Sequence, residues 1–343
     1  MNGSTAPKQT AGRSFYGWFG RKFAQYILVL LIALSINFAL PRLAPGDPLI
    51  YFMGQEINTL TPEQRQRINR ELGLDQSVWE QYGSFMMGAV TMQLGSSTKF
   101  GKPVTQVLAE RMPWTFLLVL PAIIISPIIG VICGAFAAWN RGKRRDLVLL
   151  TSMLAVESMP GFWVGMLLIA IFAVNLGWLP SYGAVPLVKA DTVTYIIEIV
   201  RRMILPVATI TISTVGTYFL LTRSSMLDTL GQDYILMAEA KGVSKRRVIY
   251  RHALRNALLP VYTHITMSLG ILVSGAVVVE TVFSYPGIGR LLFESVTARD
   301  FPMMQGVFLM ITVGVIAANL LADLTYPLVD PRARFRKTLE GSA

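Results

Sequence analysis

Six long uncharged runs dominate the pattern of hydrophobic and polar positions along the chain. They cover residues 23–41, 112–140, 158–188, 203–222, 256–279 and 301–322. Each can form a helix of about 20 residues, which crosses roughly 30 Å of hydrocarbon. The third run is apolar from Leu147 onward and encloses Glu157, so its helix is expected to begin near residue 147. None alternates like a strand of a membrane barrel, so the pattern predicts six membrane-spanning helices.

The composition indicates an integral membrane protein rather than a soluble one. The 343 residues are 53% hydrophobic and 15% charged, and the mean hydropathy is +0.50, whereas a typical soluble domain carries about 25% charged residues. One cysteine, Cys133, and two histidines, His252 and His264, provide neither a disulfide framework nor the ligands of a zinc site. We therefore expect no metal and no cofactor on this chain.

The distribution of positive charge predicts the orientation. Most lysines and arginines fall in the N-terminal segment, in the segments after the second and fourth runs, and in the C-terminal segment. Such loops stay in the cytoplasm, which predicts a cytoplasmic tail (1–22), a transmembrane domain (23–328) and a second cytoplasmic tail (329–343). The first run exceeds the core of a signal peptide and is expected to be retained. The net charge of +11 is then a topology signal, and no nucleic acid is expected as a partner.

The extracytoplasmic segment 43–111 is too long to be a simple connector. Within it, Thr61 is a suitable N-cap, Pro62 suits the first helical position, Gln64 can complete a capping box, and Gly73 can end the helix. We expect a small folded excursion. It either caps the helix bundle or helps to receive a substrate or a soluble donor protein.

The cytoplasmic loop 223–256 carries most of the information about function. Asp233 is expected to N-cap a short helix from residue 234 to 241, Gly242 to stop it, and Ser244 to cap a second helix. Small side chains at Ala238 and Ala240 allow the backbone of another protein to approach closely. Two readings stay open at this point, a solvated basic loop and a docking site for a partner protein.

The energy source lies outside this chain if it transports against a gradient. The sequence contains no G-x-x-x-x-G-K-[ST] motif, since Gly101-Lys102 is followed by Pro103 and Gly142-Lys143 by Arg144. The chain therefore has no phosphate-binding loop of the P-loop type. Either another chain or an ion gradient must supply the energy.

Two acidic residues are candidates for the translocation path. Glu157 falls about 16 Å into its span at 1.5 Å per residue, and a carboxylate near the middle of a bilayer is a functional candidate by default. The alternative is a structural carboxyl group beside Pro160, which interrupts the helix. Glu280 follows the fifth run and either anchors the next loop or lines the path.

Several strings, in order along the chain, resemble the permease subunit of bacterial dipeptide, oligopeptide and nickel-type ABC importers. They are RLAPGDP at 42–48, RMPWT at 111–115, SMPGF at 158–162, ETVFSYPGIG at 280–289, RDFP at 299–302 and DPR at 330–332. The loop adds RSSML at 223–227, DYILMAEAKG at 233–242 and HALRNALLP at 252–260, which are similar to the EAA loop of that family. One departure is MQLG at 92–95, where the family usually has GDLG.

The resemblance implies an all-α protein with the six-helix fold of type I importer permeases, in the bacterial cytoplasmic (inner) membrane. It implies four kinds of partner: a second homologous permease subunit, two ABC ATPase subunits that carry ATP and Mg, an extracytoplasmic substrate-binding protein and membrane lipid. Peptides are the expected substrates. It also assigns coupling to the ATPases to one set of loop residues: Asp233, Tyr234, Ala238, Glu239, Ala240, Lys241 and Gly242.

Two other classes of function compete with this interpretation. An ion-coupled secondary transporter also has several spans and a mid-membrane carboxylate, but it needs no long cytoplasmic loop and more often shows repeated broken helices. A membrane hydrolase needs a nucleophile, a base and an orienting group, and neither histidine has a convincing partner in the sequence. We therefore expect a non-catalytic permease subunit, with the secondary transporter as the alternative.

Overall fold

The computed structural model describes residues 11–43, 60–71, 75–186, 191–274 and 276–329, and these residues are almost entirely helical. The helices are α1 (Ala11–Leu43), α3 (Pro62–Glu71), α4 (Val78–Thr91), α5 (Val104–Trp139), α6 (Arg144–Glu157), α7 (Gly161–Leu168), η2 (Ile169–Asn175), α8 (Thr192–Leu230), α9 (Asp233–Ala240), α10 (Lys245–Arg247), η3 (Val248–Ala253), α11 (Leu254–Ser274), α12 (Val277–Val282), α13 (Ile288–Ala298) and α14 (Phe301–Val329). Two of them, η2 and η3, are π-helical. The predicted all-α fold is confirmed for this part of the chain.

The apolar helices correspond to the predicted runs, with one correction. Four described helices are long and apolar enough to cross a membrane: Gly20–Ala39 within α1, α5, α8, and Phe301–Thr325 within α14. The third run was expected to form one helix, but it forms α6 and α7–η2, which are bent by 98°. Pro160 occupies the N-cap of α7 and has no N–H to continue the helix. The fifth run corresponds to α11, which also contains Arg255.

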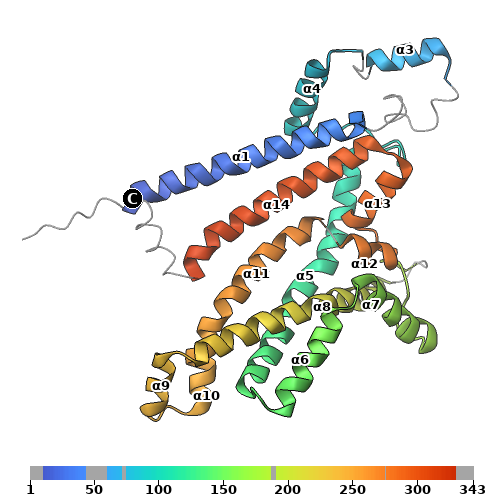
Figure 1. Ribbon diagram of the computed structural model, residues 1–343. Coiled ribbons are helices and arrows are strands. Elements are labelled where there is room, and N and C mark those ends of the chain that lie inside the picture. The colour runs from blue at the N-terminus through green and yellow to red at the C-terminus, as the bar shows by residue number, and fades with distance from the viewer. Residues whose placement is uncertain (1–10, 44–59, 72–74, 187–190, 275, 330–343) are drawn as a thin grey trace, which may run out of the picture.

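A bundle of α5, α8, α11 and α14 forms the centre of the molecule, and α1 lies along α14 at its edge (Figure 1). The closest packing is between α5 and α8. A Cβ atom at Gly134 would lie 2.7 Å from the carbonyl oxygen of Phe219 and 2.8 Å from the Cβ of Thr222. Small residues allow membrane helices to approach in this way, so α5 and α8 form one tightly packed pair.

The two terminal helices are held together by a polar contact. Lys22 Nζ lies 2.9 Å from Asp323 Oδ2, and the Tyr26 hydroxyl donates to the same oxygen at 2.8 Å. Helix α1 begins at Ala11, within the predicted tail 1–22, and its apolar span covers Gly20–Ala39. The predicted tail 329–343 lies outside the described residues apart from residue 329.

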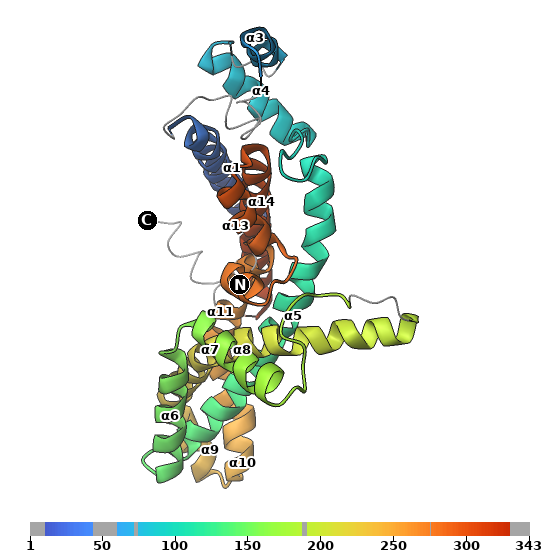
Figure 2. The ribbon, with the colours of Figure 1, turned by 90° about the vertical axis from the view of Figure 1, so that its right-hand side faces the viewer.

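The described residues between α1 and α5 form the helices α3 and α4, at the end of the molecule opposite α9 and α10 (Figure 2). The predicted capping box of α3 is confirmed: the Thr61 N–H donates to Gln64 Oε1 at 2.8 Å, and the Gln64 N–H donates to Thr61 Oγ1 at 3.3 Å. Gly73, its predicted end, lies outside the described residues. Helix α4 is an addition to the predicted elements, and α5 begins at Val104, within the predicted segment 43–111.

Candidate functional site: the α9 loop and two buried carboxylates

The predicted cytoplasmic loop 223–256 begins within helix α8 and contains α9. Helix α8 continues through Arg223 to Leu230, and Gly231 is its C-cap. The prediction of Asp233 as an N-cap is wrong, because Gln232 holds that position without a side-chain hydrogen bond and α9 begins at Asp233. In the first turn the carboxylate of Asp233 still lies near the positive end of the helix. Ser244 is confirmed as the N-cap residue of α10, although its side chain makes no capping bond.

Gly242 ends α9 as the sequence predicts. Its φ is +74°, a left-handed conformation that favours glycine. The Gly242 N–H donates to the carbonyl of Glu239 at 2.9 Å, and the Val243 N–H donates to the carbonyl of Ala238 at 3.2 Å. These two bonds form a Schellman motif. No heavy atom lies within 4 Å of a Cβ built on Gly242, so only the backbone conformation restricts this position within the chain.

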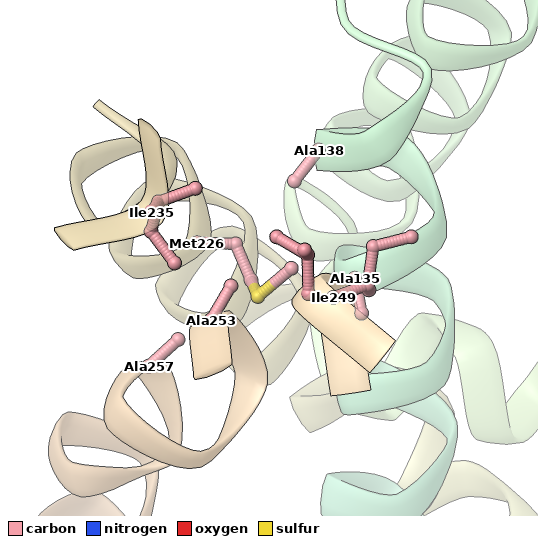
Figure 3. Close-up of a cluster of buried hydrophobic side chains, with 8 residues drawn as sticks. Ala135, Ala138, Met226, Ile235, Ile249, Ala253 and Ala257 are labelled. Carbon is pink, nitrogen blue, oxygen red and sulfur yellow. The ribbon is translucent and has the colours of Figure 1, made fainter. Parts of the chain in front are cut away.

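One side of α9 is fixed to the bundle by apolar contacts. Ile235 is 2% exposed and packs in a cluster with residues of α5, α8, η3 and α11 (Figure 3). We call this the anchor cluster; its buried members are Ala135, Ala138, Met226, Ile235, Val248, Ile249, Ala253 and Ala257. Because the cluster joins the ends of three long helices to α9, a force on α9 is transmitted to all of them.

The other side of α9 is exposed and apolar. Leu236 and Met237 are each 59% exposed and Tyr234 is 42% exposed, while the charged residues Asp233 and Glu239 are exposed beside them. An exposed apolar patch with a polar rim is the kind of surface on which proteins bind one another. We call Tyr234, Leu236 and Met237 the docking patch.

The structure separates the seven predicted coupling residues. Ala238 is partly buried and packs against the anchor cluster, so it faces the bundle. Asp233, Tyr234, Glu239, Ala240, Lys241 and Gly242 are exposed. Leu236 and Met237 are not among the predicted residues, although two large apolar residues in a short loop helix are a signal for an exposed contact. Tyr234 is also tied to α11, since Asn256 Nδ2 donates to its hydroxyl at 2.8 Å.

Glu157 is the last residue of α6, directly before the break that precedes α7. Thr217 Oγ1 donates to Glu157 Oε1 at 2.8 Å. The second carboxylate oxygen, Oε2, is buried and has no hydrogen-bond partner among the described residues. A Cβ on Gly216 would lie 2.8 Å from this oxygen, so the glycine makes room for the carboxyl group against α8.

Glu280 lies in α12, is 0% exposed and is fully engaged in hydrogen bonds. Thr115 Oγ1, on α5, donates to Oε1 at 2.9 Å, and the Arg290 N–H donates to Oε2 at 2.9 Å. Thr115 Oγ1 in turn accepts a bond from the Ile288 N–H at 2.8 Å. A Cβ on Gly287 would overlap the carboxylate. These contacts tie the start of α13 to α5 and favour the anchoring interpretation of Glu280.

The described residues contain no group of three or more His, Cys, Asp and Glu side chains that could hold a metal ion. The candidate site consists of the exposed docking patch on α9, the anchor cluster beneath it, and two carboxylates on other helices. Such an arrangement offers a surface for a partner and a route for transmitting motion.

Comparisons with known proteins identify the family. Residues 17–119 match the family "Binding-prot-dependent transport system membrane comp, N-term", and residues 130–335 match "Binding-protein-dependent transport system inner membrane component". The dipeptide transport system permease protein DppB of Escherichia coli (strain K12) is 38% identical over 320 residues, which are 88% of this chain and 94% of that protein. The di/tripeptide transport system permease protein DppB of Pseudomonas aeruginosa (strain UCBPP-PA14) is 35% identical over 317 residues, with the same coverage.

Among solved structures, an inward-facing conformation of the MetNI methionine ABC transporter matches with a TM-score of 0.51 and 15% identity, over 66% of this chain and 97% of that chain. This likeness concerns the fold alone. None of these comparisons supports ion-coupled secondary transport. The chain therefore belongs to the family of binding-protein-dependent transport system inner membrane components, as a multi-pass permease subunit with the fold of type I ABC importers.

Proposed function

We propose that this chain is the membrane-spanning subunit of an ATP-driven importer of di- and oligopeptides. The names of its relatives in Escherichia coli and Pseudomonas aeruginosa support the peptide substrate. The observation that carries the coupling role is the two-sided character of α9, since Ile235 is buried in the anchor cluster while Leu236 and Met237 face outward.

The proposal includes partners and an orientation. Two ABC ATPase subunits, which hold ATP and Mg, lie on the cytoplasmic side, and the docking patch binds in a groove of an ATPase subunit. A second homologous permease completes the translocation path, and an extracytoplasmic binding protein delivers the peptide. Both chain termini lie in the cytoplasm, in keeping with the arginine- and lysine-rich segments at that end.

The geometry supports a mechanical role for α9. When the ATPases close on ATP, they displace the docking patch. The anchor cluster fixes α9 to α5, α8 and α11, and the Schellman motif holds the end of α9 itself. Helix α9 therefore moves as a lever rather than bending alone. Helix α8 also packs against α6 and α7 on the two sides of their break, so its tilt reaches the residues around Glu157.

Substitution of the docking patch tests this role. We expect Leu236→Ser to reduce co-purification of the ATPases and to uncouple ATP hydrolysis from peptide uptake, with normal membrane insertion, because an exposed side chain contributes to the contact and not to the fold. Val90→Ser on α4, where Val90 is 78% exposed, is the matched control and should keep the ATPases bound. Full retention of ATPases and coupling in the Leu236 variant would contradict the proposal.

The peptide assignment has its own test. The tagged complete complex is purified with its binding protein, reconstituted in proteoliposomes and supplied with ATP inside. Uptake of a labelled dipeptide that depends on ATP supports the assignment. Uptake that follows a proton or sodium gradient without ATP contradicts it and favours a secondary transporter.

A further inference from the structure

A cleft of about 1360 Å³ opens between α5, the end of α8, and the η3–α11 segment. None of its lining residues belongs to the anchor cluster, and the two carboxylates lie on other helices, α6 and α12. The wall of the cleft is apolar over most of its length, with Ile128 and Ile132 from α5 and Leu258, Leu259 and Ile265 from α11. Ile128 is 53% exposed and Ile132 is 64% exposed.

The cleft has a basic end. Arg251 and Arg255 line it together with His252, close to the start of α11. No ion pair or side-chain hydrogen bond engages Arg251 or Arg255 within the part of the chain that the structure describes. Asp228 is the acidic residue of the lining, so the arginines outnumber it.

A second, smaller hollow extends this basic surface. It measures about 470 Å³, shares Arg251 with the cleft, and adds Arg246, Arg247, Ser244 and the exposed ring of Tyr250. Basic residues and an exposed tyrosine directly beside the start of a membrane helix are typical of the region where lipid headgroups lie.

The apolar wall extends to the depth of the acyl chains. Helix α5 ends at Trp139, so at 1.5 Å per residue Ile132 lies about 10 Å and Pro127 about 18 Å from that end. Pro127 belongs to the same lining. The cleft thus changes from cationic at the end of the helices to apolar within the span, as a phospholipid changes from headgroup to chain.

We propose that this cleft binds one anionic phospholipid of the surrounding leaflet, with its phosphate at Arg251 and Arg255 and an acyl chain against Ile128, Ile132 and Leu258. Basic pockets between membrane helices at the cytoplasmic surface bind such headgroups. The proposal rests on the orientation in the proposed function, which places this end in the cytoplasmic leaflet. A hydrophilic peptide matches the basic end but not the apolar wall.

The position of the cleft gives the lipid an influence on coupling. Gln232, the N-cap of α9, and Tyr234 of the docking patch also line it. A lipid in this cleft lies beside α9 and between two helices that α9 must move, so its presence stabilises one arrangement of α5 and α11. The coupling of ATP hydrolysis to uptake is therefore expected to depend on anionic lipid.

The test compares lipid binding to the complete transporter. Wild type, Arg251→Gln/Arg255→Gln, and the matched control Arg144→Gln/Arg145→Gln are purified, and phosphatidylglycerol bound to each is measured by native mass spectrometry. All four arginines are exposed, so both variants lose the same surface charge. We expect about 30-fold weaker binding in the Arg251/Arg255 variant and wild-type binding in the control. Equal binding in all three proteins would overturn the proposal.

A second variant tests the apolar wall without altering charge. Ile132→Trp fills the cleft from an exposed position on α5 and is expected to reduce phosphatidylglycerol binding as well. If this variant binds phosphatidylglycerol as well as wild type does, the lipid lies on the basic surface outside the cleft, which contradicts the proposal. Displacement of the lipid by inorganic phosphate would also overturn the proposal. So would a cross-link to the second permease from Ile132→Cys, made in a Cys133→Ser background.

The lipid requirement is distinguished from the transport function by one further measurement. ATP-driven uptake of a dipeptide is compared in proteoliposomes of phosphatidylcholine with and without phosphatidylglycerol. We expect added phosphatidylglycerol to increase coupled uptake by wild type and by the Arg144/Arg145 control, but not by the Arg251/Arg255 variant. Equal uptake in both lipids refutes the lipid effect alone, whereas absence of ATP-driven uptake in either lipid refutes the proposed function.

Discussion

The α12–α13 turn and the α9 loop are held in place by different kinds of contact. At the turn, the buried Glu280 carboxylate accepts hydrogen bonds from Thr115 and from the Arg290 N–H. At the loop, α9 is held mainly by the apolar anchor cluster around Ile235. Hydrogen bonds in a low-dielectric interior fix a direction, whereas apolar contacts are not directional. The turn is thus built to keep one geometry, and the loop is built to stay attached while its neighbours shift.

The largest effect is expected where the turn is broken. Glu280→Ala leaves Thr115 Oγ1 and the Arg290 N–H without their acceptor in a buried site, which costs about 4 kcal/mol of stability. We expect a large fall in the melting temperature of the purified protein. Glu110→Ala, at an exposed carboxylate paired with Lys102, is the control and should be almost unchanged. Similar melting temperatures for both variants would show that the hydrogen bonds at Glu280 do not hold the turn.

Loss of the apolar anchor is expected to have the next largest effect. Ile235→Ala removes most of a buried side chain, and such changes cost about 3 kcal/mol. Because α9 is short, we expect the loss to appear as local loosening of the loop, with faster hydrogen exchange in α9 and weaker coupling. Leu236→Ala, on the exposed side, should leave exchange unchanged. If both variants exchange at the same rate, the anchor cluster is not what fixes α9.

The contrast between these regions also explains which features the sequence could predict. The runs of apolar residues predicted α5, α8 and α14, and local rules predicted the capping box at Thr61 and the stop at Gly242, because these depend on neighbouring residues. The contact between Thr115 and Glu280 joins residues 165 positions apart and leaves no local pattern. Likewise, α9 is too short for its periodicity to distinguish the buried Ile235 from the exposed Leu236. The break after Glu157 does have a local signal in Pro160, but the apolar run continues across it, so the run by itself predicts one helix.

A smaller effect is expected at the end of α9. Gly242→Ala places a side chain on a backbone with φ of +74°, which costs about 1 kcal/mol, and the open space around the residue adds no clash within the chain. We expect a slight loss of stability with a clear loss of ATPase coupling. Gly242→Asn, which tolerates the left-handed conformation, separates two causes. Normal coupling in the asparagine variant indicates backbone strain, and lost coupling indicates close approach by a partner; normal coupling in the alanine variant would contradict the lever assignment.

The smallest effect on stability is expected at Glu157, and it provides the sharpest contrast with Glu280. Glu157→Gln keeps an oxygen to accept the bond from Thr217, and the replaced oxygen has no partner among the described residues. Glu280→Gln instead places an NH₂ group either against the Arg290 N–H, where two donors then face each other, or against Thr115 Oγ1, which can accept from it but then leaves its own O–H without an acceptor. We therefore expect the free energy of unfolding of Glu157→Gln to lie within about 0.5 kcal/mol of the wild-type value. The melting temperature of this variant should then be close to that of wild type, and that of Glu280→Gln should be well below it. A change in peptide uptake by the stable Glu157→Gln variant would assign Glu157 to the path, whereas destabilisation equal to that of Glu280→Gln would mean that both carboxylates are structural.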